Sequence, residues 1–108
     1  MTQEDLVFVR NILAYLATCE LSRMDLTVLA YLANGFFKQS EIATDLKLRL
    51  GSISQTVYRL EARGFIEERP HVDHRLHALK ITEKGMNALR ELVDHGHQPA
   101  NNPTWSPE

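Results

Sequence analysis

The sequence has 108 residues, of which 44% are hydrophobic and 24% are charged, a composition typical of one small folded domain. The single cysteine excludes an intrachain disulfide, and no apolar run is long enough to span a bilayer. The N-terminal residues 1–5 are acidic, unlike the basic start of a signal peptide, so we expect a cytoplasmic protein with no membrane partner.

The charge is distributed unevenly, although the formal net charge of −2 does not itself favour a nucleic-acid partner. Residues 47–80 carry seven basic and four acidic side chains, a balance of +3. The balance is −3 for residues 1–46 and −2 for residues 81–108. A central basic segment modestly favours DNA, although a solvated basic surface has the same composition.

The first expected element is a helix over residues 3–19. Apolar residues recur there at the spacing of one helical face: Leu6, Val9, Leu13, Leu16 and Ala17. Further apolar residues lie off this stripe, which predicts burial on more than one side. Because the chain is small, the second side is expected to need another subunit, and residues 1–20 are interpreted as a dimerisation helix.

A second helix is expected to begin at Ser22, because Ser22 and Asp25 resemble a capping box. Asn34 and Gly35 tolerate the left-handed conformation and should end it. The expected buried face consists of Leu26, Leu29, Ala30 and Ala33, with Val28 and Leu32 beside it.

Two further helices are expected on either side of a tight turn at residues 47–49. The third helix begins at Gln39 or Ser40 and ends near residue 46, and the fourth extends from about Leu50 to Arg63. Inward-facing residues of the fourth helix recur at helical spacing: Ile53, Val57 and Leu60. Gly64 then stands where a helix commonly ends.

A hairpin and a last helix complete the expected order. The sequence predicts a strand over residues 65–69 that ends at Pro70. A polar loop is expected over residues 71–75, and the return strand over residues 76–82. Thr82 should cap a helix over residues 83–95, for packing or dimerisation. Residues 96–108 contain three prolines and predict a disordered tail.

This order predicts a mainly α fold with a two-stranded β wing, a winged helix-turn-helix in the order α-α-α-α-β-β-α. The DNA-binding domain would comprise residues 21–82. A helix fits the major groove of DNA, and a hairpin with a basic tip can reach an adjacent minor groove.

The motifs of this region resemble those of the MarR-type transcriptional regulators. The segment 46–66 matches their helix-turn-helix and ends in the pattern Leu-Glu-x-Arg-Gly followed by two apolar residues. Asp73-His74-Arg75 matches their Asp-x-Arg loop, and Ile81-Thr-Glu-Lys-Gly85 matches Leu-Thr-Glu-Lys-Gly. The resemblance covers about residues 20–92.

The resemblance implies a sequence-specific DNA-binding regulator, expected to be a repressor, that binds a pseudo-palindromic site in double-stranded DNA. It implies a homodimer formed through the N- and C-terminal helices, with no cofactor. The recognition helix (about 50–63) would lie in the major groove and the wing (70–76) in the minor groove. Arg75 would enter the minor groove, and Asp73 would hold it in place.

Polar side chains near the start of the recognition helix are the other candidates for DNA contact: Ser52, Ser54, Gln55 and Arg59. Gln55 can read adenine through two hydrogen bonds, whereas Arg59 is expected to contact phosphate or solvent. Arg49 stands where the family usually has a capping serine and is expected to contact phosphate instead.

The recognition helix also departs from the family in ways that lower its polarity. Leu50 and Gly51 replace residues that tend to be polar, and Gln55 stands where an arginine is common. A winged-helix protein-interaction module, an adaptor or antagonist of another regulator with little DNA binding, therefore remains the alternative interpretation.

Other chemistry has weaker support. We expect no enzyme, because no catalytic constellation or glycine-rich phosphate loop can be placed. His71, His74 and His77 are interpreted as solvated side chains of the wing, because spacing of three in a strand alternates faces, although imidazole can also bind metal. Cys19 is interpreted as structural, with redox sensing as the alternative.

Four aromatic residues are candidates for the lining of a pocket that binds a small aromatic effector: Tyr15, Tyr31, Phe36 and Phe37. Aromatic residues at helical spacing are more often ordinary core residues, and this interpretation is favoured.

Overall fold

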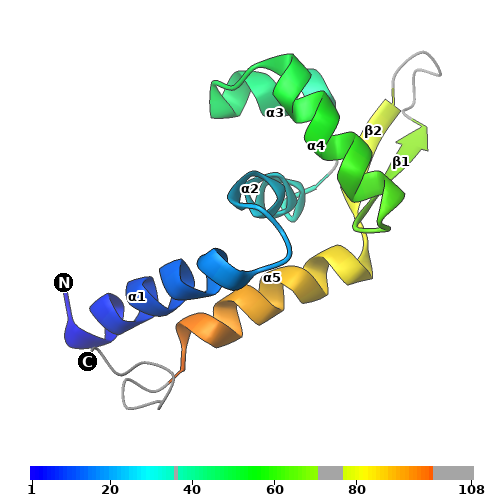
Figure 1. Ribbon diagram of the computed structural model, residues 1–108. Helices are drawn as coiled ribbons and strands as arrows, with labels where there is room; N and C mark the ends of the chain where they lie inside the picture. The colour runs from blue at the N-terminus through cyan, green and yellow to red at the C-terminus, as the bar shows by residue number, and fades with distance from the viewer. Residues whose placement is uncertain (36, 71–76, 99–108) are drawn as a thin grey trace.

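The computed structural model describes residues 1–35, 37–70 and 77–98, and it confirms the predicted winged helix-turn-helix fold (Figure 1). The elements follow the predicted order: α1 (Gln3–Thr18), α2 (Arg23–Leu32), α3 (Gln39–Leu46), α4 (Leu50–Ala62), β1 (Ile66–Pro70), β2 (His77–Ile81) and α5 (Glu83–Gly96). Among the described residues, no helix is both long and apolar enough to cross a membrane.

Side-chain caps define where the helices begin. Ser22 Oγ accepts a hydrogen bond from the Asp25 amide, and Asp25 Oδ2 accepts one from the Ser22 amide, each at 3.0 Å. The predicted capping box of α2 is therefore confirmed. Thr82 Oγ1 caps α5 by accepting from the Gly85 amide at 3.2 Å, as expected.

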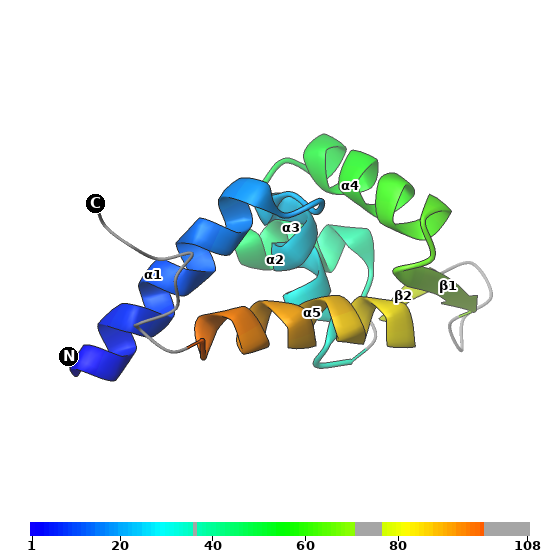
Figure 2. The same ribbon diagram turned by 60° about the horizontal axis from the view of Figure 1, so that its bottom comes forward.

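The core lies between α2, α4 and the wing, with α5 covering one side (Figure 2). Its largest fully buried side chains come from α2, α3, α4 and β1: Leu29, Leu32, Ile42, Ile53, Leu60, Ile66, Val28 and Val57. The expected buried face of α2 was partly wrong, because Ala30 and Ala33 are exposed. α2 contacts α4, α5 and β2, and these neighbours bury Val28 and Leu32 instead.

α1 lies against α5 along the lower edge of Figure 1. Its packed face includes Phe8, Asn11 and Tyr15, and of the expected apolar stripe Leu16 packs against the core. Asn11 is buried, and its Nδ2 donates to the carbonyl oxygens of Gly96 and Gln98, each at 3.0 Å. Since a Cβ on Gly96 would lie 2.7 Å from Phe8 Cδ2, only glycine permits this approach.

The stripe expected to be buried in α1 is largely open to solvent. Leu13 is 61% exposed, and Leu6 and Val9 are each 46% exposed. Among the described elements α1 packs mainly against α5, which leaves Leu6, Val9 and Leu13 exposed, whereas Leu16 packs against the core.

The boundary expected for the C-terminal tail was too early. Gly96 belongs to α5, and Gln98 accepts the hydrogen bond from Asn11. The His97 ring packs 4.9 Å from that of Phe8. Residues 99–108 lie outside the described part of the chain.

The two wing strands are antiparallel, with Ile66 opposite Ile81 and Pro70 opposite His77. Phe37, in the connection between α2 and α3, adds a short bridge to Leu79 through two backbone hydrogen bonds of 2.8 and 3.3 Å. The sequence analysis did not predict this bridge, which ties the helix-turn-helix to the wing.

Candidate nucleic-acid interface

The inner face of α4 fixes which of its side chains point outward. Ile53, Thr56, Val57 and Leu60 are buried against the rest of the domain. Because a helix has 3.6 residues per turn, the opposite face carries other residues, all exposed: Gly51, Gln55, Tyr58 and Ala62. This outward face is the surface that a helix-turn-helix presents to the major groove.

Three predicted contact residues are exposed at the start of α4: Arg49, Ser52 and Gln55. Arg49 is the N-cap residue, and its side chain makes no capping hydrogen bond. The first amides of a helix carry partial positive charge and lack partners within it, which suits a phosphate. This end of α4 thus combines polar side chains with a site favourable to anions.

Ser54 is held by another element and is only half exposed. Its Oγ donates to Oε1 of Gln39 at 2.7 Å, which joins the second turn of α4 to the start of α3. Ser54 therefore positions the two helices of the motif relative to each other, in addition to lying near the predicted surface.

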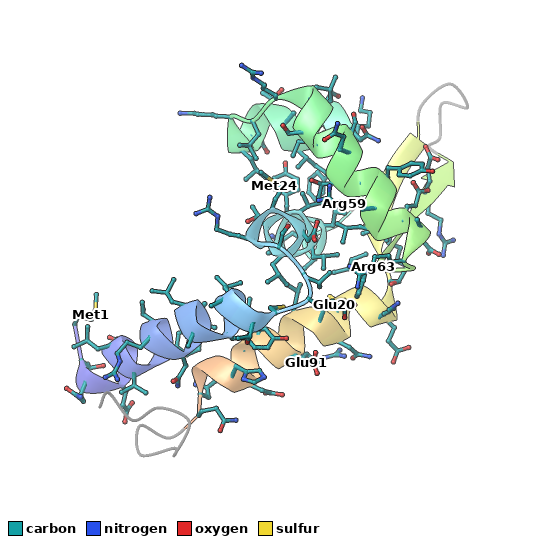
Figure 3. The ribbon with its side chains drawn as sticks, viewed as in Figure 1. Met1, Glu20, Met24, Arg59, Arg63 and Glu91 are labelled. Carbon is teal, nitrogen blue, oxygen red and sulfur yellow. The ribbon has the colours of Figure 1, made fainter. Side chains whose placement is uncertain are left out.

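Arg59 is paired with a buried carboxylate. Its Nη2 lies 3.0 Å from Oδ1 of Asp25, whose side chain is 8% exposed. Figure 3 shows Arg59 between α4 and the start of α2. The prediction of phosphate or solvent contact missed this partner, because the two residues lie 34 positions apart.

Asp73 and Arg75, the predicted wing-tip residues, lie outside the described residues, as do His71 and His74. The strands that lead to them are described. In β1, Arg69 donates to Glu67 Oε1 at 2.7 Å. The part of the chain that the structure describes contains no group of three metal-ligating side chains.

The start of α5 holds the end of α4. Lys84 Nζ donates to the Arg63 carbonyl oxygen at 2.5 Å, and Thr82 Oγ1 donates to that of Gly64 at 2.7 Å. These bonds satisfy carbonyl groups that a helix end leaves without partners. Lys84 Nζ also lies 4.5 Å from the centre of the Phe65 ring. The Thr-Glu-Lys-Gly motif is therefore a joint between the recognition helix and α5.

A second contact at this joint is an ion pair on the surface. Arg63 Nη2 lies 2.9 Å from Oε1 of Glu20, in the connection between α1 and α2 (Figure 3). Exposed pairs of this kind contribute little stability.

The aromatic residues weighed for an effector pocket belong to separate contacts. Tyr15 stacks on His95 of α5 with ring centres 4.0 Å apart, whereas Tyr31 meets Phe37 edge to face at 4.6 Å. Phe36 lies outside the described residues. A hollow of about 280 Å³ beside Tyr31 and Phe37 is also lined by Glu41 and Asp45, an unfavourable setting for an aromatic acid.

Cys19 is half-buried at the C-terminal end of α1. A hydrogen bond with Cys19, followed by burial, raises the pKa of Tyr15 to about 12. Tyr15 and Cys19 therefore lie close together at the end of α1.

Two exposed residues of α4 were not among the predicted contacts. Tyr58 is 75% exposed and Leu50 is 51% exposed. A helical projection of residues 50–62 would have found Tyr58, because it lies opposite the buried Ile53, Val57 and Leu60.

Comparison with known proteins gives the same fold. The family model for the MarR family matches residues 20–75. The apo form of MarR from E. coli is 20% identical with a TM-score of 0.72, over 89% of this chain and 70% of that one. No curated protein sequence is matched.

Two further solved structures are similar. The transcriptional regulator Tm0710 from Thermotoga maritima is 22% identical with a TM-score of 0.74, over 84% of this chain and 65% of that one. A variant of ZitR from Lactococcus lactis is also 22% identical, with a TM-score of 0.65 over 71% of this chain. The chain spans 53% of the length of that ZitR, and at these identities the likeness shows the fold alone.

Proposed function

Because this chain belongs to the MarR family of transcriptional regulators, we propose that it is a cytoplasmic repressor that binds a pseudo-palindromic DNA site as a homodimer. Each subunit would place α4 in the major groove and residues 70–76 in the minor groove. A dimer bound to such a site excludes other proteins from the same DNA, which would suffice for repression.

The exposed outward face of α4 is the observation that carries the proposal. Gln55 and Ser52 offer hydrogen-bonding groups to base edges, and Arg49 at the N-cap is open to a phosphate. Hydrogen bonds from Thr82 and Lys84 join the residues that end α4 to the start of α5, and α4 itself packs on α2, α3 and β1.

The exposed stripe of α1 supports a homodimer. Leu6, Val9 and Leu13 lie on one side of α1, and Val93 on α5 is 47% exposed. Apolar residues gathered at one end of a small domain are typical of a protein interface. The aromatic contacts described above give no support to a shared effector pocket, so the proposal contains none.

The test is the affinity for DNA as a function of salt concentration, measured on a duplex that the protein itself enriches from random-sequence DNA. Phosphate contacts release counterions, so the logarithm of the affinity should fall linearly with the logarithm of salt concentration, with a slope of about −0.9 for each contact. Arg75→Ala should weaken binding to the enriched duplex.

A matched variant outside the proposed surface is Arg90→Ala, on the exposed side of α5. Its affinity should equal that of the natural chain. Binding that is independent of salt, or equal for Arg75→Ala and the natural chain, would contradict the DNA contacts proposed for the wing. Failure to enrich any duplex would favour the protein-interaction module.

A further inference from the structure

The recognition helix has an unusually apolar exposed surface. Leu50, in the first turn, and Tyr58, two turns later, are both large apolar residues that are more than half exposed. Gly51, on the same outward face as Tyr58, has nothing within 4 Å of the place where a Cβ would stand. Both side chains lie on the helix proposed to enter the major groove, where apolar groups can contact base edges.

The charges of α4 limit which base pairs it can read. Guanine is most often recognised by an arginine or lysine that donates two hydrogen bonds. Arg59 is the only basic residue of the helix, and its guanidinium is paired with the buried Asp25 at 3.0 Å. The Arg59 side chain is 52% exposed, but one nitrogen of its guanidinium is bonded to Asp25, so residues 50–62 offer guanine a single cation that is already partly engaged.

The groups that remain exposed suit adenine and thymine. The amide of Gln55 can bond to both N6 and N7 of adenine. Thymine differs from cytosine in the major groove by its C5-methyl group, which is recognised by apolar contact. A shallow hollow of about 390 Å³ on α4 is lined by Ser54, Gln55, Tyr58 and Arg59.

We propose that α4 selects A·T base pairs through contacts of Leu50 and Tyr58 with thymine methyl groups. This inference rests on the DNA-binding function proposed above. The two residues are eight positions apart, which corresponds to about 12 Å along the helix. This separation is comparable to three or four base pairs, so each residue would contact a different thymine of the half-site.

The experiment replaces each thymine of the enriched duplex by deoxyuridine, one position at a time. This change removes the methyl group and leaves base pairing intact. The natural chain should lose about fourfold in affinity at each contacted position, as expected for one methyl-sized apolar contact. Leu50→Ala should abolish the loss at one position, and Tyr58→Ala at another.

Tyr58→Phe is the matched control, because it keeps the ring and removes only the hydroxyl group. It should retain the preference for thymine over deoxyuridine. Both residues are exposed, so thermal unfolding of each variant should match that of the natural chain.

The outcomes separate this inference from the function on which it rests. Salt-dependent binding with equal affinity for thymine and deoxyuridine at every position would overturn the inference and leave DNA binding intact. Enrichment of half-sites made of G·C pairs would also overturn it. If no duplex is bound, the proposed function fails as well, and the apolar surface of α4 belongs to a protein interface.

Discussion

At the scale of single residues, Asp25 connects two parts of the helix-turn-helix. One carboxylate oxygen accepts from the Ser22 amide and caps α2, and the other accepts from Arg59 of α4. The side chain is 8% exposed, so both bonds lie in a largely desolvated setting. Hydrogen bonds to a charged group are stronger there than at an open surface.

Asp25→Ala should therefore lower the free energy of unfolding by about 2–3 kcal/mol, the combined effect of losing a cap and a charged hydrogen bond. Asp5→Ala is the matched control. Asp5 makes the same capping box with Thr2 at the exposed start of α1, so its loss should be about 0.5–1 kcal/mol. If urea unfolding gave the same loss of unfolding free energy for Asp25→Ala and Asp5→Ala, the contribution of Arg59 would be contradicted.

Tyr31 provides a prediction about pH. A hydrogen bond from its hydroxyl to Asp45, in α3, raises the pKa of Tyr31 from 10.0 to about 12. A raised pKa means that the folded state favours the protonated phenol. The resulting stabilisation is complete below pH 10 and is lost as the pH rises through 12.

The absorbance of phenolate is measured as a function of pH for the natural chain and for Tyr31→Phe. The difference between the two titration curves reports Tyr31 alone. The midpoint of this difference should be about 12. Asp45→Asn should move it back toward 10, because the charged acceptor is removed. A midpoint near 10 in the natural chain would show that the hydrogen bond does not form.

At the scale of elements, the joint between α4 and α5 depends on Gly85. A Cβ at this position would lie 2.6 Å from Ile81 Cγ1 and would also meet the backbone oxygen of Phe65. The contact is with backbone as well as side chain, so it cannot be relieved by a change of rotamer. Gly85 allows α5 to begin directly beneath the wing.

Gly85→Ala should destabilise the fold by about 1–3 kcal/mol, as overpacking does. Gly51→Ala is the matched control, because it makes the same change in a helix where no atom lies within 4 Å of the new Cβ. There alanine should raise the free energy of unfolding by about 0.5–1 kcal/mol. Thermal unfolding that ranks the two variants in the opposite order would contradict this account of the joint.

The elements show what the sequence could and could not predict. The helices, the caps at Ser22 and Thr82 and the order of the fold depend on local patterns, and all of these were predicted. The buried faces of α1 and α2 were partly wrong, because they depend on which distant elements cross each helix. The bridge at Phe37 and the pairing of Arg59 with Asp25 were missed for the same reason, since both join residues far apart in sequence.

At the scale of the whole molecule, the exposed stripe of α1 is the feature that a single chain leaves unexplained. Leu13→Asp should convert a dimer of two 12.4 kDa chains to a monomer, because it places a charge in the apolar interface. Light scattering measures the mass directly.

Leu50→Asp is the matched control. It makes the same substitution at another half-exposed leucine, the first residue of α4, which lies outside the exposed stripe of α1. The mass of the dimer should therefore be unchanged. A monomer for the natural chain, or an unchanged mass for Leu13→Asp, would contradict the role assigned to the stripe.

Whether two chains bind one DNA site is tested most directly by the mass of the protein–DNA complex at low salt. The predicted result is one enriched duplex with two chains of 12.4 kDa, dissociating as salt is raised. One chain for each duplex, or no complex at any salt concentration, would contradict the account.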